Sequence, residues 1–309
     1  MIEENIRNFN RQLEWEPKIE NENNLHRGRA VVLGMGGSHI GADLLNAYDI
    51  KMALAVHSNY GLPFWVSKEN LIIASSYSGN TEEVLDGLNQ ALSGGFKTAV
   101  ITSGGKLLEA AKEKSLPFVQ LPGGLQARMS AGYQVKALAK LLDREDLLEE
   151  INDLAGKFNS SESEAKGKEL AEKIGNKIPV IYSSEFNKAL SYTWKIRFNE
   201  TAKVPAFYNI FPEMNHNEIN GFTPGQNFHF ILLSDSEDHP QIKKRLEIFS
   251  KLYTEKGFSV EKINLTGEGR FNRLFSNLIL ADWASYYLAK QNGSDPEQIP
   301  LVEEFKKLI

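Results

Sequence analysis

The sequence predicts an α/β fold in which two domains each hold a mostly parallel sheet between layers of helices. Short apolar runs alternate with helical patterns along the chain, and this alternation is typical of βαβ units. The chain has 309 residues, which suggests two domains at roughly 100–200 residues each. Its composition, with 41% apolar and 24% charged residues, is that of an ordinary globular protein.

The first domain is expected to span residues 1–150. Apolar runs predict strands over Ala30–Leu33, Ala53–Val56, Leu71–Ser75, Thr98–Ile101 and Phe118–Leu121. Helices are predicted near Gly41–Ala47, Glu82–Leu92 and Leu107–Lys114, with a closing helix over Ser130–Leu142.

Residues 151–176 are expected to be a helical connection, because the segment is rich in Glu, Lys and Ser and has few large apolar residues. A second α/β domain, with a C-terminal helix, is expected over residues 177–309. Its strands are predicted over Ile178–Ile181, Phe228–Leu233 and Ser259–Ile263. Its helices are predicted over Asn187–Ala202, Gln241–Lys256, Arg270–Gln291 and Glu297–Ile309.

The composition excludes several kinds of chemistry. The chain contains no cysteine, so disulfides, thiolate catalysis, Fe–S clusters and cysteine-ligated zinc are ruled out. The net charge of −5 gives no electrostatic case for nucleic acid or an anionic membrane as a partner. No run approaches the ~18 apolar residues of a spanning helix, and residues 1–20 lack the apolar core of a signal peptide. We therefore expect a soluble cytoplasmic protein.

A glycine-rich turn, Gly34-Met35-Gly36-Gly37-Ser38, follows the first predicted strand. A strand, a glycine turn and a helix start place backbone N–H groups where an anion can bind. The turn does not match the dinucleotide fingerprint, because His39 stands where the third glycine belongs. Either Gly37 and Ser38 contact a ligand, or the glycines only allow the helix to pack tightly on the strand.

Three hydroxyl side chains, Ser76, Ser78 and Thr81, follow the apolar run Leu71–Ser75 and precede a predicted helix. Hydroxyls together with the free N–H groups of a helix N-terminus form a phosphate site that needs no Lys or Arg. A capping box is the alternative, but it would use only one of the hydroxyls. The cluster therefore predicts phosphate binding.

These motifs resemble those of a known family. Ser-x-Ser-Gly-Asn-Thr after a buried strand, here residues 76–81, is the mark of the sugar isomerase (SIS) domain, which binds phosphosugars. Phe198-Asn199-Glu200-Thr201-Ala202-Lys203 and Asn215-His216-Asn217-Glu218 resemble signatures of the bifunctional phosphoglucose/phosphomannose isomerase family. The resemblance covers nearly the whole chain and implies two three-layer αβα domains of the SIS type.

Glu200 is the candidate general base. It lies near the end of a predicted helix that Pro205 terminates, where a carboxylate faces the negative end of the helix dipole. Such a departure from a local rule is a flag for function. On the residue alone, a surface Glu paired with Arg197 is the alternative. The resemblance implies that Glu200 matches the family's general base.

Two further side chains gain roles from the resemblance. His216 lies between two asparagines, can exchange a proton near neutral pH, and matches the family's ring-opening histidine, which reaches the neighbouring subunit's site. Arg128 follows the loop after a predicted strand, where open α/β sheets bind ligands. It matches the family's active-site arginine, and a guanidinium there could stabilise an enediolate. A surface histidine and a surface arginine are the alternatives.

The family pattern also has a lysine a few residues from the C-terminus, and Lys306 matches it best. Lys307 is adjacent, and Lys290 is a weaker candidate. Relatives often have Thr or Gln about two helical turns before this lysine, whereas this chain has Ile299. That departure bears on whether the mannose epimer is accepted.

The resemblance implies an aldose–ketose isomerase that interconverts glucose 6-phosphate, and mannose 6-phosphate, with fructose 6-phosphate through a cis-enediol(ate). It also implies a homodimer in which His216 is donated across the interface. No cofactor or metal is expected, since the sequence has no HxH, HExxH or His-rich tract. The alternatives are another SIS phosphosugar isomerase, or a regulator that binds sugar phosphates without turnover.

Overall fold

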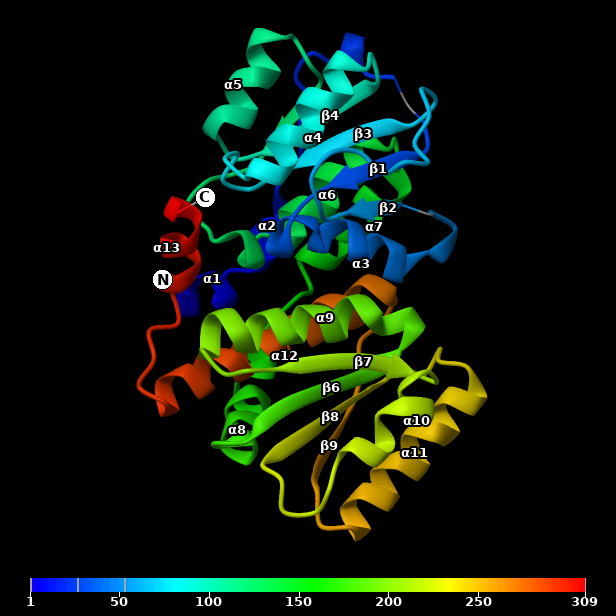
Figure 1. Ribbon diagram of the computed structural model, residues 1–309, viewed down its shortest axis with the longest axis vertical. Helices are drawn as coiled ribbons and strands as arrows, with labels where there is room; N and C mark the ends of the chain where they lie inside the picture. Colours follow the sequence, from blue (N-terminus) through cyan, green and yellow to red (C-terminus); the bar gives the residue numbers. More distant parts are fainter. Residues whose placement is uncertain (1, 27, 53, 309) are drawn as a thin grey trace. The chain divides into compact units, whose positions relative to one another are not determined.

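A computed structural model describes residues 2–26, 28–52 and 54–308, and the chain divides into two compact units (Figure 1). The N-terminal unit is Asn8–Phe158. The C-terminal unit combines the residues that precede Asn8 with those that follow Phe158. Each unit has its own sheet, so the predicted pair of α/β domains is confirmed.

The N-terminal unit is built on a five-stranded parallel sheet with the order β2-β1-β3-β4-β5. Its strands are β1 (Ala30–Leu33), β2 (Ala55–His57), β3 (Leu71–Ser75), β4 (Lys97–Thr102) and β5 (Phe118–Gln120). Every residue of β1 and β3 is buried. Their unbroken apolar runs are what a parallel sheet covered on both faces requires.

Helices cover both faces of this sheet (Figure 1). They are α2 (Asn10–Glu14), α3 (Ile40–Tyr48), α4 (Glu82–Ser93), α5 (Gly105–Glu113), α6 (Ala131–Leu141) and α7 (Glu145–Ala155). On one face, α4 and α5 bury Val84, Leu88 and Leu107 against β3 and β4. The helices α3 and α6 pack together on the other face.

The C-terminal unit has a four-stranded parallel sheet with the order β7-β6-β8-β9. Its strands are β6 (Ile178–Ser184), β7 (Phe207–Phe211), β8 (Phe228–Ser234) and β9 (Ser259–Asn264). Its helices are α1 (Ile2–Arg7), α8 (Glu164–Ile174), α9 (Lys188–Arg197), α10 (Met214–Asn217), α11 (Pro240–Glu255), α12 (Arg270–Gln291) and α13 (Pro300–Leu308). Aromatic side chains of α11, Phe249 and Tyr253, pack against Tyr182 and Phe230 of the sheet.

The two sheets repeat one topology. In chain order, β6, β7, β8 and β9 take the places that β1, β2, β3 and β4 take in the N-terminal unit. The fifth place, which β5 fills beside β4, has no counterpart beside β9 among the described residues. Within the part of the chain that the structure describes, this edge of β9 is therefore not paired with another strand.

The observed unit boundaries differ from the expected ones. The division falls between Phe158 and Asn159, inside the segment 151–176 expected to be a connection. Its two helices bury their apolar faces in different units, α7 through Leu147 and Ile151 and α8 through Leu170. The segment is thus not a separate connection.

The first helix also lies outside the expected domain 1–150. The Arg7 guanidinium pairs with Glu164 at 2.6 Å and lies 4.9 Å from the ring centroid of Trp283. The hydroxyl of Tyr286 donates to Glu3 at 2.7 Å. Because these partners belong to α8 and α12, α1 is part of the C-terminal unit.

The strongest sequence patterns gave the most accurate bounds. The observed β1, β3 and α12 have the predicted limits. The helix predicted over Asn187–Ala202 changes character at Phe198, and the last helix begins at Pro300 rather than Glu297. The strand predicted from Ala53 is observed from Ala55, and Ala53 itself lies outside the described residues. The strand β7 and the short helix α10 were not predicted.

Candidate active site

The three hydroxyls predicted to bind phosphate lie together at the carboxyl end of β3. Ser76 Oγ is 2.8 Å from Thr81 Oγ1 and 3.5 Å from Ser78 Oγ. Gly79, with φ +71, turns the chain so that its N–H donates to Ser76 Oγ at 3.1 Å. A Cβ at Gly79 would lie 1.8 Å from the carbonyl oxygen of Gly104, so the turn requires glycine.

The hydroxyl cluster is not explained by helix capping. Thr81 is the residue before α4, yet its side chain makes no capping hydrogen bond. The first N–H groups of a helix have no partner within the helix and carry its positive dipole end. The hydroxyls and these N–H groups together form a neutral site suited to an oxyanion.

The glycine-rich turn after β1 is joined to this cluster. The N–H of Tyr77 donates to Ser38 Oγ at 3.1 Å, and Ser75 Oγ donates to the Ser38 carbonyl at 2.7 Å. Ser38 is 7% exposed. Its oxygen accepts a bond within the protein, so its hydroxyl proton can be donated to a ligand.

Gly37 brings Arg128 next to the same turn. A Cβ at Gly37 would lie 2.6 Å from the backbone nitrogen of Arg128, a distance that no other residue type tolerates. Arg128 belongs to a short turn before α6 and is 1% exposed. Gln134 holds the turns together, since its Nε2 donates to the carbonyls of Gly37 at 2.8 Å and Ala127 at 3.2 Å. Gly37 therefore allows two backbone segments to approach closely. The neighbouring segment is the turn that carries Arg128, and not a strand as the packing alternative assumed.

Tyr77 connects the hydroxyl cluster to the loop that leads to Arg128. Its hydroxyl donates to the Pro122 carbonyl at 2.7 Å and accepts the Leu125 N–H at 3.0 Å. Burial raises the pKa of Tyr77, which keeps the hydroxyl protonated and able to serve both partners. Sequence reasoning did not single out this residue.

Tyr77→Phe is expected to destabilise the N-terminal unit by about 1–2 kcal/mol, because it leaves the Leu125 N–H without its acceptor. It is also expected to lower kcat/KM about tenfold, since the loop before Arg128 loses its anchor. Urea unfolding and steady-state kinetics measure the two effects. Tyr133→Phe is the matched control, because no hydrogen bond of the Tyr133 hydroxyl is seen in the described structure. Equal stability and activity in the two variants would contradict the role of Tyr77.

Glu200 lies on a single turn of π-helix, Phe198–Ala202, that continues α9. Such turns are rare, and they are frequent at functional sites. Lys203 ends the turn in the left-handed conformation with φ 57, two residues before Pro205. The Glu200 side chain is half-buried.

The expected alternative partner of Glu200 is engaged elsewhere. Arg197 is fully buried and forms an ion pair with Asp282 of α12. Among residues 2–26, 28–52 and 54–308, its Nη1 and Nη2 have no hydrogen-bond partner, so the Asp282 carboxylate compensates its charge. Sequence reasoning missed this pair. A lone acidic residue inside the apolar stretch Leu278–Trp283 was the available signal.

His216 is exposed on the short helix α10, just after β7. Glu218 fixes this segment, since it accepts from the Tyr182 hydroxyl at 2.6 Å and from the Asn209 amide. Burial, followed by the hydrogen bond to Glu218, raises the pKa of Tyr182, so tyrosine is the donor. The other anchor is Arg245, whose Nη1 donates to Asn215 Oδ1 at 3.3 Å.

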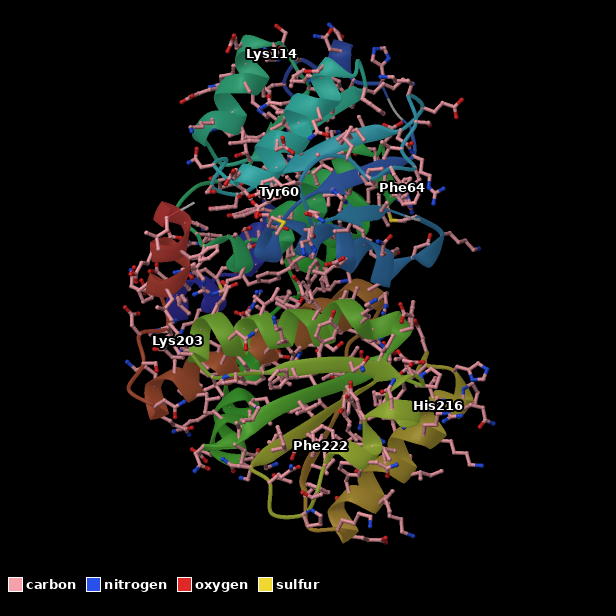
Figure 2. All side chains as sticks on the ribbon, in the orientation of Figure 1. Tyr60, Phe64, Lys114, Lys203, His216 and Phe222 are labelled. Atoms are coloured by element: carbon pink, nitrogen blue, oxygen red, sulfur yellow. The ribbon has the colours of Figure 1, made fainter. Side chains whose placement is uncertain are left out.

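Glu200 and His216 lie at opposite ends of β7. The turn that carries Glu200 precedes the strand, and α10 follows it. Figure 2 shows Lys203 at one end of the four-stranded sheet and His216 at the other. A strand of five residues spans about 15 Å, so the two side chains of one chain do not meet.

The lysine candidates lie on exposed helical segments of the C-terminal unit. Lys306 is on α13 with its Nζ 3.1 Å from Glu303, and Lys290 is in the last turn of α12. The side chain of Lys307 lies outside the described residues. The structure therefore groups Gly37, Ser38, Ser76, Ser78, Thr81 and Arg128 in one unit, and Glu200, His216 and Lys306 at separate places in the other.

The described residues contain neither a metal-binding cluster nor a membrane-spanning helix. Among residues 2–26, 28–52 and 54–308, no group of three or more His, Cys, Asp or Glu side chains is arranged to hold a metal ion. In the same part of the chain, none of the helices has the length and apolar character needed to cross a membrane.

Comparison with known proteins identifies the family. Residues 163–309 match the model of the bacterial phospho-glucose isomerase C-terminal SIS domain. Over 98% of its length, the chain is 36% identical to the bifunctional phosphoglucose/phosphomannose isomerase of Aquifex aeolicus, and the match covers 96% of that protein. The chain belongs to the bifunctional phosphoglucose/phosphomannose isomerase family. The resemblance inferred from the sequence motifs is thereby confirmed.

Further comparisons agree with membership of the bifunctional phosphoglucose/phosphomannose isomerase family. A relative of that name from Caldicellulosiruptor bescii is 34% identical over 91% of this chain and 89% of its own length. The crystal structure of tagatose-6-phosphate ketose/aldose isomerase from Escherichia coli superimposes with a TM-score of 0.72 over 96% of this chain and 94% of that chain. At 14% sequence identity this likeness shows the fold alone, and it supports the predicted pair of SIS layers.

Proposed function

We propose that the chain interconverts glucose 6-phosphate, and also mannose 6-phosphate, with fructose 6-phosphate through a cis-enediol(ate) intermediate. The observation that carries the proposal is the hydroxyl cluster of Ser76, Ser78 and Thr81 in a chain 36% identical to a bifunctional isomerase over 98% of its length. A phosphate ester is too strongly charged to cross a bilayer unaided, so we place the reaction in the cytoplasm.

The substrate phosphate is bound by the three hydroxyls and the N-terminus of α4. This site carries no formal charge of its own, and it holds an anion through O–H and N–H donors. Ser38, whose hydroxyl accepts the Tyr77 N–H, lies beside the sugar. Gly37 takes part by letting the Arg128 turn approach.

Glu200 moves the proton between carbons. Its carboxylate takes the proton from C2 of the aldose and returns it to C1, which gives the ketose. Negative charge develops on the oxygens of the enediolate, and the Arg128 guanidinium stabilises it. Because C2 is planar in the enediolate, its reprotonation on either face yields the glucose or the mannose epimer.

His216 and Lys306 assist ring opening by moving a proton to and from the ring oxygen. We propose that His216 acts in the site of a second subunit of a homodimer. The support is its exposure and its place at the far end of β7 from Glu200. Glu200 and His216 can then act in the same site only if the partner chain supplies one of the two.

Turnover of fructose 6-phosphate by the purified protein tests the activity. We expect glucose 6-phosphate and mannose 6-phosphate to form, and their ratio measures how well the mannose epimer is accepted in a chain that has Ile299. Binding of fructose 6-phosphate without turnover would favour a non-catalytic regulator. Turnover of a pentose or heptose phosphate alone would favour another SIS isomerase.

Subunit mixing tests the donation of His216. Glu200→Gln and His216→Ala are each expected to be nearly inactive, whereas their random heterodimers hold one complete site of two. Since half of the dimers are then mixed, about a quarter of wild-type activity is expected to return. The measurement is the activity of separately tagged variants after co-expression. If activity stays at the level of either variant alone, His216 acts within its own chain.

A further inference from the structure

A pocket lies within the C-terminal unit, beside the edge of β9 that pairs with no strand among the described residues. Its volume is about 370 Å³, and it is lined by residues of α8, β9 and α12. This volume falls in the range of small-molecule sites, roughly 300–1,000 Å³. None of Glu200, His216 and Lys306 lines it.

The topology explains why space is open at this place. In the N-terminal unit, β5 pairs with β4, and the corresponding position beside β9 holds no strand in the part of the chain that the structure describes. The ion pair of Lys173 on α8 with Glu261 on β9, at 3.1 Å, bridges the edge of the sheet instead. The pocket therefore exists because the sheet of the C-terminal unit has four strands and lacks a fifth one beside β9 in the described structure.

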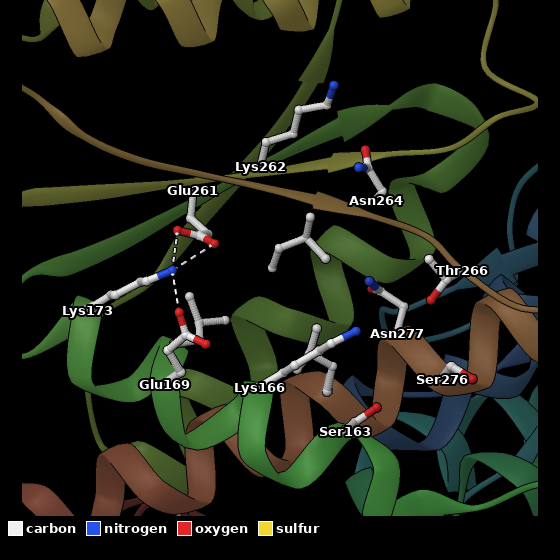
Figure 3. A pocket seen from close by; sticks show the side chains of 13 residues that line it. Ser163, Lys166, Glu169, Lys173, Glu261, Lys262, Asn264, Thr266, Ser276 and Asn277 are labelled. Atoms are coloured by element: carbon white, nitrogen blue, oxygen red, sulfur yellow. Dashed lines mark hydrogen bonds and ion pairs between the residues drawn. The ribbon is translucent and has the colours of Figure 1, made fainter.

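One lysine that lines the pocket, Lys166, has no ionic partner among the described residues. Lys173 lies 2.9 Å from Glu169 and 3.1 Å from Glu261, and these contacts are drawn as dashed lines in Figure 3. Lys262 pairs with Glu247. Among the described residues, the Lys166 ammonium has neither an ion pair nor a hydrogen bond. Since Lys173 is shared by two carboxylates, the named charges balance overall, and Lys166 is the lining cation that is available to pair with an anion.

A buried amide presents its donor to the same space. Asn277 is 4% exposed and lines the pocket. Its Oδ1 accepts from Trp194 Nε1 at 2.8 Å, and because an indole N–H is only a donor, this contact fixes the amide orientation. In the described structure, Asn277 Nδ2 has no hydrogen-bond partner. Figure 3 shows the Lys166 ammonium directed toward this amide.

Hydroxyl groups and an apolar wall complete the site. Ser163, Thr266 and Ser276 line it, and Ser276 Oγ already donates to Asn272 Oδ1 at 2.8 Å. Leu170 and Leu280 supply apolar surface. One cation, an amide donor and hydroxyls suit a single phosphate group, and the remaining volume suits a small carbon skeleton with hydroxyls.

We propose that this pocket binds a small organic phosphate ester, with the phosphate at Lys166 and Asn277, at a site distinct from the proposed catalytic one. The proposal does not depend on turnover. Glycerol 3-phosphate is a suitable probe, because it carries the proposed groups and is not a hexose. Inorganic phosphate tests whether the carbon skeleton contributes.

The experiment removes the catalytic phosphate site first. In full-length protein with Ser78→Asp, a carboxylate repels phosphate from the β3 cluster. Isothermal titration with glycerol 3-phosphate, at constant ionic strength, then reports the second site. We expect saturable binding in this background with a stoichiometry of one per chain, and weaker binding of inorganic phosphate.

Three substitutions in that background locate the binding. Lys166→Glu is expected to weaken it at least tenfold, while Lys168→Glu, the same charge change two residues along α8, leaves it unchanged. Asn277→Asp keeps the Oδ1 acceptor for Trp194 and replaces the donor by an anion, so it is also expected to weaken binding at least tenfold. Unfolding curves confirm that each variant is folded. Absence of saturable binding, or equal effects of Lys166→Glu and Lys168→Glu, would overturn the proposal.

Discussion

Glu200→Gln is expected to lower kcat for isomerisation of fructose 6-phosphate by about 10²–10⁴-fold, with little change in KM. The amide has the shape of the carboxylate but cannot accept a proton from carbon. The proposed phosphate site, at Ser76, Ser78 and Thr81, belongs to the other unit, so the substitution leaves it intact. Steady-state kinetics on the purified variant measures the effect.

A second measurement follows the proton transfer at carbon directly. In D₂O, wild-type enzyme is expected to place deuterium at C1 or C2 of the product, because the base exchanges its proton with solvent. Glu200→Gln should lose this exchange together with turnover. Glu172→Gln on the exposed face of α8 is the matched control and should retain both. Full turnover by Glu200→Gln would contradict the assignment of the base.

Much of the fold was predictable because central strands are buried on both faces and therefore consist of unbroken apolar runs. Ala30–Leu33 and Leu71–Ser75 are apolar throughout and fully buried, so their bounds followed from the sequence. Phe207–Phe211 is an edge strand whose residues are mostly half-exposed, with Phe207 56% exposed. Such a strand carries no periodicity that distinguishes it from a loop.

In the candidate site, contacts between residues close in sequence could be predicted, whereas contacts between distant residues could not. Ser76, Ser78 and Thr81 are neighbours in sequence, so their meeting in space could be predicted. The anchors of the His216 segment, Tyr182 and Asn209, lie on strands whose pairing no single sequence segment reveals. The π-turn that carries Glu200 likewise depends on packing against α12.

The ion pair of Arg197 and Asp282 makes the second large prediction. Both side chains are buried, Arg197 at 0% and Asp282 at 2% exposure, and the pair joins the end of α9 to α12 directly before the turn that carries Glu200. Asp282→Ala leaves a buried guanidinium without its counter-charge. Loss of one partner of such a pair is expected to lower the free energy of unfolding by about 3–5 kcal/mol, measured by urea denaturation.

The double substitution Arg197→Met with Asp282→Leu separates two possible causes of the instability of Asp282→Ala. One is the loss of packing between α9 and α12, and the other is the cost of burying an uncompensated charge. It removes both ions and fills the space with apolar atoms, so most of the stability lost in Asp282→Ala should return. If the charge is the cause, the double variant is more stable than either single one. If the double variant is as unstable as Asp282→Ala, the packing of α9 on α12 at this point, rather than charge compensation, is what holds the Glu200 turn in place.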